Sequence, residues 1–442
     1  MPSLGGWYSP ADLTIASAVL LAWQQEGRES ALQLLGNSQA DERSGSLLSE
    51  LRLRLTQAPG PRLLVDGLWF ARPWGGISRV WDQILRCWRL PGLITPQAPV
   101  ALIDRNSHTA LSEGFDSLSA SEADPLDWPG LSACSGENGR LVQQWQADVF
   151  LSSWITTTAP PRQQPLCAEL ALVHDCMPER SQADPEQMRQ RRRWLQGAAG
   201  WLAVSAASAA DVEGLLQRRA GSVPWCHPAV DPSFQQPLPA AVAKRLLARL
   251  RQRLGLRDPY VLLPSISVPG SYKNPEVLAE ALCRSGLEPV QLLRSGGGSA
   301  VVAQQLLDRF PALEGRSLTA GLTELELALV YRQALAVVMP SRIEGFGLPA
   351  LEALAAGGTV LLADSRGLRE AGGRACLRFP AHNPGQLAGL LCALLDPSTG
   401  PWLRCRLASR RTAHLNRFHP HLLGLALLAE ARRLSAAPPA AR

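Results

Sequence analysis

Short apolar runs recur along the chain, and most of them end in Asp, Ser or His. A first series contains RLLVDG, VALID, DVFLSS, LALVHD and GWLAVS, and a second contains YVLLPS, PVQLLRSGGG, ALAVVMPS and GTVLLAD. The segments between these runs carry apolar residues at helical spacing. Short buried strands that alternate with helices predict an α/β fold with parallel, doubly wound sheets.

Breaks in this pattern divide the chain. Ser9 as a helix N-cap and Pro10 at the first helical position open a helical start, while the proline-rich PWCHPAVDPSFQQPLPAA indicates a linker. We predict a helical N-terminal extension (1–60), an N-terminal Rossmann-like domain (61–235), a linker and helix (236–257), a C-terminal Rossmann-like domain (258–420) and a C-terminal helix with a flexible tail (421–442). Residues 105–140, rich in Ser, Gly and Asp, predict a loop or a small insertion.

The composition fits a two-domain globular protein of 442 residues. The net charge of +6 is mild, and no dense Lys/Arg tract with interleaved aromatic residues occurs, so nucleic-acid binding has little support. Affinity for acidic membrane surfaces or phosphorylated substrates stays open. The nine cysteines include no C-x-x-C pair, which argues against a zinc ribbon or a disulfide framework and favours reduced thiols in a cytoplasmic protein.

The apolar stretch LTIASAVLLAW near the N-terminus raises the question of a membrane segment. It is too short to span a bilayer, and no basic residue precedes it, as a signal peptide would require. We therefore expect no transmembrane segment and a cytoplasmic protein. The extension at 1–60 is expected to serve packing; the alternative is an interfacial helix that brings about peripheral membrane association at the cytosolic face.

The segment SRIEGFGLPALEALAAGGTVLLAD (341–364) combines two carboxylates with a predicted anion site. Free backbone N–H groups at a helix start attract phosphate, and Gly345 and Gly347 allow a ligand to approach the backbone. Glu344 lies in the glycine loop, and Glu352 lies about one turn into the predicted helix. A nucleotide sugar has hydroxyls on both sides of its phosphates, so this arrangement favours such a ligand.

Two other readings of this segment stay open. A glutamate near the start of a helix is favoured by the helix macrodipole alone, which is a sufficient reason for Glu352. In addition, GFGLPA fits the G-x-G-x-x-A pattern of dinucleotide-binding domains, with Asp364 at the end of the next strand. That fingerprint normally lies in the first βαβ unit, whereas here it lies deep in its domain.

The same segment resembles the E-x7-E signature of glycosyltransferase family 4, whose members are retaining enzymes with the GT-B fold. Other stretches resemble the family in the same order along the chain: GGISR, ALVHDCMPE, WLAVSAASAADV, PAVDPSF, SYKNPEVLAEAL and LTELELALVYRQALAVVMPS. Together they cover roughly residues 61–420. The resemblance implies two Rossmann-like domains that face a cleft, with the donor bound to the second domain and the acceptor to the first.

The resemblance also implies roles for residues of the donor domain. Glu344 would contact hydroxyls of the donor sugar, Glu352 would bind the ribose, and Lys273 would neutralise the diphosphate. The backbone of the glycine turn would hold the donor; this turn comprises Gly345, Phe346, Gly347 and Leu348. Lysine is rare in this chain, which has only Lys244 and Lys273, and one of the two lies in this motif.

In the first domain, the resemblance implies that the loop of Gly75 and Gly76 closes on the donor. His174 would lie near the reacting sugar, with Asp175 beside it. Taken alone, His174 would more often be a satisfied core histidine, and the glycine pair could be an ordinary turn.

The implied chemistry needs no metal. The chain has no D-x-D motif, with which other glycosyltransferases bind one; a lysine, a helix start and loop amides can stabilise a leaving diphosphate instead. The family commonly has an arginine shortly before the lysine, and LLPSISVPGSYKN has none. Arg294, Arg342 and Arg79 are the candidate replacements.

These features predict a retaining, metal-independent hexosyltransferase. It would move a mannose- or glucose-type hexose from a GDP- or UDP-sugar to a saccharide or lipid-linked saccharide, in polysaccharide or lipopolysaccharide biosynthesis, with no cofactor besides the donor substrate. Two alternatives remain: an NAD-type Rossmann enzyme, and a catalytically weak protein of the same fold that binds sugar nucleotides.

Overall fold

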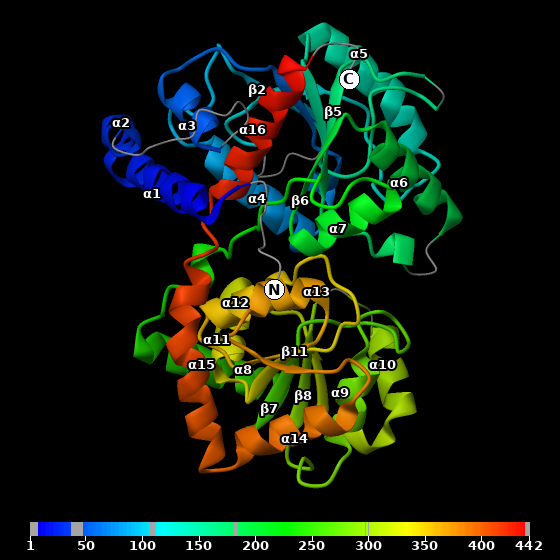
Figure 1. Cartoon of the computed structure of the whole chain (residues 1–442). Helices are drawn as coiled ribbons and strands as arrows, with labels where there is room; N and C mark the ends of the chain where they lie inside the picture. The colour runs from blue at the N-terminus through cyan, green and yellow to red at the C-terminus, as the bar shows by residue number, and fades with distance from the viewer. Residues whose placement is uncertain are drawn as a thin grey trace. The chain divides into compact units, whose positions relative to one another are not determined.

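The chain forms two compact units, Met1–Ala229 with His419–Arg442, and Val230–Phe418. The structure is a computed structural model that describes residues 8–36, 47–105, 112–161, 163–180, 184–296, 298 and 300–437. Each unit contains a six-stranded parallel sheet flanked by helices (Figure 1). The predicted α/β fold with two doubly wound parallel sheets is therefore confirmed.

The first sheet has the strand order β3-β2-β1-β4-β5-β6. Its strands are β1 (Leu63–Asp66), β2 (Val100–Asp104), β3 (Asp116–Ser119), β4 (Val149–Ser152), β5 (Ala168–Val173) and β6 (Gly200–Ala203). Strands β1, β4, β5 and β6 are buried along their whole length, because helices cover both faces of a parallel sheet, and this explains their uninterrupted apolar runs.

The edge strand β3 lies where the sequence predicted a loop or a small insertion over 105–140. Its sequence, DSLS, is polar, and the strand is largely exposed, so it lacks the apolar pattern that identifies a buried strand. The segment also contains most of helix α5 (Leu131–Trp145). The remaining helices of the first unit are α1 (Pro10–Glu26), α2 (Arg28–Gly36), α3 (Leu47–Leu55), η1 (Leu68–Ala71), α4 (Gly76–Trp88), η2 (Pro178–Arg180), α6 (Pro185–Gly197), α7 (Ala206–Leu215) and α16 (Leu422–Ala436).

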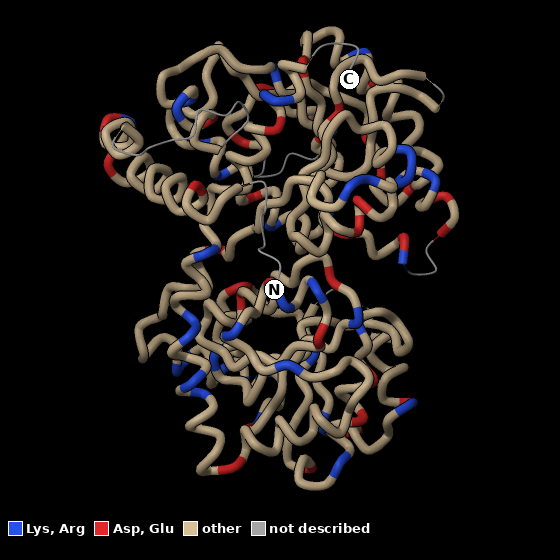
Figure 2. The backbone as a smooth tube through the Cα atoms, viewed as in Figure 1, with Lys and Arg blue, Asp and Glu red and all other residues tan. Residues whose placement is uncertain are grey.

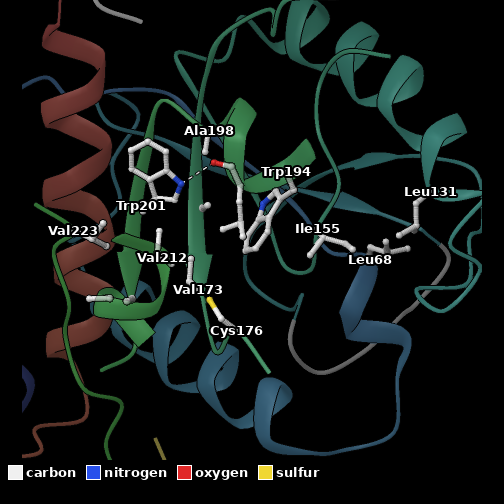
Figure 3. Packing of buried hydrophobic residues seen from close by; sticks show 14 residues of the cluster. Leu68, Leu131, Ile155, Val173, Cys176, Trp194, Ala198, Trp201, Val212 and Val223 are labelled. Carbon is white, nitrogen blue, oxygen red and sulfur yellow. Dashed lines mark hydrogen bonds between the residues drawn. The ribbon is translucent and has the colours of Figure 1, made fainter. Parts of the chain in front are cut away.

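Tryptophans fill a core cluster of this unit. Trp194 of α6 and Trp201 of β6 pack with Val173 of β5 and Val212 of α7 (Figure 3). The indole N–H of Trp201 donates to the carbonyl of Leu195 at 2.9 Å, so its polar atom is satisfied within the core.

The C-terminal helix α16 belongs to the first unit and does not stand apart from it. It packs against α4, α3, β5 and β6. The indole of Trp88 donates to the carbonyl of Gly424 at 3.0 Å, and a Cβ on Gly424 would lie 2.7 Å from the Cβ of Cys87. Glycine is needed there because the two helices approach too closely for a side chain.

The N-terminal helices also pack into the first unit, where the sequence predicted an extension. The buried Glu50 of α3 binds Arg54 at 2.7 Å and also pairs with Arg432 of α16. Helix α1 buries Ala16, Val19, Leu20 and Trp23. Within the described ranges, no helix combines the length and apolar character needed to cross a bilayer.

The second unit repeats the plan of the first, with the strand order β12-β11-β10-β7-β8-β9. Its strands are β7 (Tyr260–Leu263), β8 (Gln291–Ser295), β9 (Ser317–Ala320), β10 (Ala336–Met339), β11 (Val360–Ala363) and β12 (Leu377–Phe379). Its helices are η3 (Pro232–Phe234), α8 (Ala240–Leu254), α9 (Pro275–Leu282), α10 (Ala300–Arg309), η4 (Pro311–Leu313), α11 (Glu324–Gln333), α12 (Leu348–Ala355), α13 (Arg366–Gly372), α14 (Pro384–Leu395) and α15 (Thr399–Leu415).

Both sheets reverse their strand order at the same place. The first and fourth strands of each unit, β1 with β4 and β7 with β10, pair in the middle of the sheet. The chain builds outward from that pair in both directions, and ligands of such sheets bind at this switch point, beyond the carboxyl ends of the strands. The loops after these four strands are therefore the candidate sites of the two units.

Candidate functional site

An ion pair lies at the switch point of the second sheet. Lys273 follows β7 and Glu344 follows β10, and the Nζ atom of the lysine lies 2.7 Å from Oε1 of the glutamate. Both side chains are more buried than exposed, at 29% and 8% exposed, so the pair is shielded and stronger than a surface pair. The structure thus brings together two of the predicted donor-site residues.

Asn274 holds the two loops of this pair in place. It begins α9 in the left-handed conformation, with φ of 54°, which asparagine tolerates better than most residues. Its side-chain amide donates to the carbonyls of Pro340 at 3.0 Å and Ala381 at 2.7 Å. The loops after β7, β10 and β12 are therefore joined through one buried side chain.

The glycine turn depends on backbone shapes that only glycine allows. Gly347 precedes α12 with φ of 118°, and a Cβ there would lie 2.8 Å from the side chain of Leu368. From the other side, a Cβ on Gly367 would lie 2.3 Å from the carbonyl oxygen of Glu344. Helix α13 thus supports the turn at close range and fixes the backbone that presents Glu344.

Other residues of the turn serve packing. Phe346 is 4% exposed, and its ring lies 5.8 Å from that of Phe418, so it anchors the loop while its backbone remains part of the turn. Gly345 lies between Glu344 and this anchor, and Leu348 is the first residue of α12. The helix starts directly at the turn, as the pattern LPALEALAAG predicted.

Glu352 is more deeply placed than the sequence suggested. It is 2% exposed, and the hydroxyl of Tyr331 donates to its Oε2 at 3.3 Å. In this conformation the carboxylate lies between α11 and α12 of the second unit.

Of the candidate replacements for the absent arginine, Arg342 lies in the loop after β10. Its guanidinium donates to Oδ1 of Asn274 at 2.8 Å and to Glu276 at 3.2 Å. Arg294 instead is buried at the end of β8 and donates to the carbonyl of Ala303; burial lowers its pKa. Arg79 lies on α4 of the first unit.

The predicted residues of the first unit also follow its strands. Gly75 caps α4 and Gly76 is its first residue; a Cβ on Gly76 would meet nothing within 4 Å, so the helix start is unobstructed. His174 directly follows β5. Burial and the nearby Arg191 lower its pKa to about 3, so its imidazole is neutral at pH 7 and can exchange hydrogen bonds with hydroxyls.

The stretch around His174 is fixed by a buried arginine that the sequence did not identify. Arg191 of α6 binds Glu179 at 2.6 Å and donates to the carbonyl of Asp175 at 2.8 Å. The negative charge of Glu179 accordingly outweighs burial and raises the pKa of Arg191. The arginine lies on the next helix, 12 positions after Glu179, and nothing in the sequence indicates that the two side chains meet.

An aromatic pair lies at the switch point of the first sheet. Trp69 follows β1 and Trp154 follows β4, with ring centroids 4.3 Å apart, and Trp128 lies 6.3 Å from Trp154. All three tryptophans are half-buried. The position of Trp69 and Trp154 beyond β1 and β4 could have been inferred from the strand order, but nothing in the sequence indicates that they meet.

The G-x-G-x-x-A match is not placed as a dinucleotide site would be. GFGLPA follows β10, the fourth strand of its sheet in chain order, whereas the fingerprint follows the first strand. The geometry therefore offers no support for the NAD-type alternative.

A family model and curated relatives match part of the chain. Residues 261–397 match the family model Glycosyl transferases group 1. D-inositol 3-phosphate glycosyltransferase of Streptomyces bingchenggensis is 35% identical over 186 residues, which are 39% of this chain and 40% of that protein. The enzyme of the same name from Acidothermus cellulolyticus is 41% identical over 91 residues, 20% of this chain and 19% of that protein. The matches thus span less than half the length of these relatives.

Solved structures resemble the whole two-sheet architecture. HepE of Anabaena, in complex with UDP-glucose, has a TM-score of 0.61 at 17% identity and covers 84% of this chain and 98% of its own. WaaG, a glycosyltransferase involved in lipopolysaccharide biosynthesis, has a TM-score of 0.62 at 12% identity and covers 82% and 98%. At these identities the likeness establishes the fold. The chain has the GT-B fold, and its residues 261–397 match the family model Glycosyl transferases group 1.

Proposed function

We propose that this protein is a retaining hexosyltransferase of glycosyltransferase family 4 that uses a nucleoside-diphosphate sugar. The observation that carries the proposal is the ion pair of Lys273 and Glu344 at the switch point of the second sheet, 2.7 Å apart. It lies directly before the start of α12, where backbone N–H groups favour phosphate. A cation, a carboxylate and a helix start at one sheet edge match the phosphates and hydroxyls of a nucleotide sugar.

The chemistry of transfer requires stabilisation of the leaving diphosphate. In the proposal, the Lys273 ammonium binds the diphosphate oxygens when the donor enters, and Glu344 exchanges the lysine for hydroxyls of the hexose. The helix start adds its amides, so no metal is needed to offset the developing charge. Glu352 is proposed to bind the ribose, which requires its carboxylate to be reached from the donor side.

The acceptor is proposed to bind the first unit. Trp69 and Trp154 present half-buried rings beyond β1 and β4, and such aromatic surfaces suit the apolar faces of sugar rings while hydroxyls find polar partners. The neutral imidazole of His174, after β5, offers one such partner. A saccharide or lipid-linked saccharide is the proposed acceptor, and WaaG, named for lipopolysaccharide biosynthesis, is similar in fold.

Lys273→Ala tests this function, and Lys244→Ala is its matched control. Lys244 lies exposed on α8, so its removal should leave turnover unchanged. Lys273→Ala should lower turnover of GDP- or UDP-sugars at least 100-fold, because an electrostatic contact to a developing charge contributes on the order of 3–4 kcal/mol. Near wild-type turnover in Lys273→Ala would refute the assignment.

A catalytically weak sugar-nucleotide-binding protein is the second candidate. It is favoured by Arg342, which is engaged with Asn274 and Glu276 and so leaves Lys273 without an observed second cation. Thermal-shift titration with UDP, GDP and NAD, followed by turnover assays on a broad acceptor panel, separates the candidates. Stabilisation by a nucleotide with neither hydrolysis nor transfer would favour the second candidate, and stabilisation by NAD alone would exclude both.

A further inference from the structure

The second unit contains a cavity at the edge of its sheet opposite to the donor loops. Its volume is about 570 Å³, and it is lined by residues preceding three strands, among them Pro259 before β7, Leu335 before β10 and Thr359 before β11. Lys273 and Glu344 lie beyond the carboxyl ends of β7 and β10, and a four-residue strand rises roughly 13 Å. A ligand in this cavity therefore does not reach the proposed donor site.

Three arginines converge on this cavity. Arg332 comes from the end of α11, and Arg404 and Arg411 come from one face of α15. Helix α15 contains four arginines and no acidic residue (Figure 2). The acidic residue of the lining, Asp258, pairs with Arg251, so its charge is already engaged.

Each of the three arginines also donates a hydrogen bond to a backbone carbonyl of the second unit. Arg332 donates to the carbonyl of Ala356 at 2.7 Å, and Arg411 donates to that of Gly358 at 3.4 Å; both carbonyls lie at the C-terminus of α12, where cations are favoured. Arg404 donates to the carbonyl of Leu394 at 3.0 Å. Each contact uses one N–H, whereas a guanidinium has five donors.

Among the described residues, the other N–H donors and the positive charges of these three arginines have no observed partner. The Nε of Arg411 is buried without a hydrogen-bond partner. Burial and the nearby positive charge of Arg332 lower the pKa of Arg411. In the part of the chain that the structure describes, none of the three cavity arginines forms an ion pair with a carboxylate. A bound anion would offset these positive charges and complete the hydrogen bonds.

We propose that this cavity is a binding site for a phosphorylated small molecule, held by Arg332, Arg404 and Arg411. Guanidinium groups bind phosphate in a bidentate manner, and the cavity volume lies in the range of small-molecule sites. Gly357 and Thr359 also line this cavity. The site is independent of the glycosyl transfer proposed above, because it shares no residue with the donor site.

Cys405 provides a direct reporter for this site. It is exposed and lines the cavity, whereas the exposed Cys283 lies outside it. The experiment measures the alkylation rates of both thiols by peptide mass spectrometry while inorganic phosphate or pyrophosphate replaces chloride at constant ionic strength. Phosphate or pyrophosphate should slow alkylation of Cys405 at least threefold and leave the rate at Cys283 unchanged.

The variant Arg404→Gln provides the specificity test, since Arg404 does not contact the end of α12. Protection of Cys405 by phosphate should be lost in this variant, while its nucleotide-induced thermal shift stays the same. The proposal is overturned if phosphate leaves the alkylation rate of Cys405 unchanged over the whole salt series, including concentrations beyond a 50-fold excess over protein. Equal slowing of alkylation at Cys405 and Cys283, or protection of Cys405 that persists in Arg404→Gln, would overturn it as well. Protection of Cys405 by phosphate should persist in Lys273→Ala, which separates this site from the donor site.

Discussion

At the scale of single residues, the site depends on side chains that connect loops. Asn274 is the clearest example, because its amide joins the loops after β7, β10 and β12 while its neighbour Lys273 carries the proposed chemistry. The sequence identified Lys273 and Glu344 through their motifs, but it did not indicate that they form an ion pair. The role of Asn274 was missed because its partners are backbone carbonyls 66 and 107 positions away.

Asn274→Ala should displace Lys273 and weaken donor binding. The change leaves buried carbonyls unsatisfied, which costs about 1–3 kcal/mol, and it places alanine in a left-handed conformation. We expect a higher KM for the nucleotide sugar together with a lower kcat. Asn383→Ala, which removes an exposed N-cap of α14, should lower stability by about 1 kcal/mol and leave both constants unchanged. An unaltered KM in Asn274→Ala would disprove the positioning role.

Trp154→Leu should weaken binding of the acceptor and leave binding of the donor unchanged. The change removes one ring of the Trp69 and Trp154 pair, an aromatic surface worth on the order of 1 kcal/mol, so the acceptor KM should rise several-fold. Hydrolysis of the nucleotide sugar without acceptor should be unchanged. Trp402→Ala, which removes a tryptophan 56% exposed on α15, is the control. Equal effects on hydrolysis and transfer would show that Trp154 only stabilises the fold.

At the scale of elements, the glycine turn shows how strand, loop and helix cooperate. Strand β10 ends at Met339, the loop presents Glu344, and α12 begins at Leu348. The residue pattern predicted each of these elements. The support of the turn by α13, through Gly367, was not predicted, because a close approach between two backbones has no local sequence pattern.

Gly347→Ala should disturb the turn strongly. The new Cβ would lie 2.8 Å from the side chain of Leu368, and the backbone of residue 347 has a positive φ. A strained backbone of this kind costs on the order of 1–3 kcal/mol. We expect a lower unfolding temperature of the second unit and loss of the thermal shift caused by UDP or GDP. Gly389→Ala on α14, where a Cβ would meet nothing within 4 Å, should be neutral or slightly stabilising. A full nucleotide shift in Gly347→Ala would contradict the proposed role of the turn.

At the scale of the whole molecule, the first unit is completed by both ends of the chain. His421 precedes α16, and its Nε2 lies 3.1 Å from the side chain of Gln24 on α1. Burial lowers the pKa of His419 and of His421 to about 4. In the unfolded chain these groups titrate near 6.5, so between pH 6.5 and 4 the unfolded state binds more protons.

The first unit should therefore lose stability as the pH falls from 6.5 towards 4. Each unit of pKa difference corresponds to roughly 1.4 kcal/mol. The pKa values of Glu169 and Glu430 are raised, which acts in the opposite direction, so the effect of histidine is measured by comparing variants. His421→Gln removes one titration and should reduce the slope of unfolding free energy against pH in this range. An identical slope in denaturant titrations at pH 4.5, 5.5 and 6.5 would count against this account.

The sequence by itself determined the α/β class, the two parallel sheets and the site motifs, because buried strands and helix starts have local patterns of apolar residues, glycine and proline. Only the tertiary structure decided which side chains meet. The ion pair of Lys273 and Glu344, the contact of Trp69 with Trp154, the depth of Glu352 and the docking of α16 on the first unit all depend on contacts between segments distant in the chain. Such contacts are set by strand order and by packing of whole elements, which no local pattern encodes.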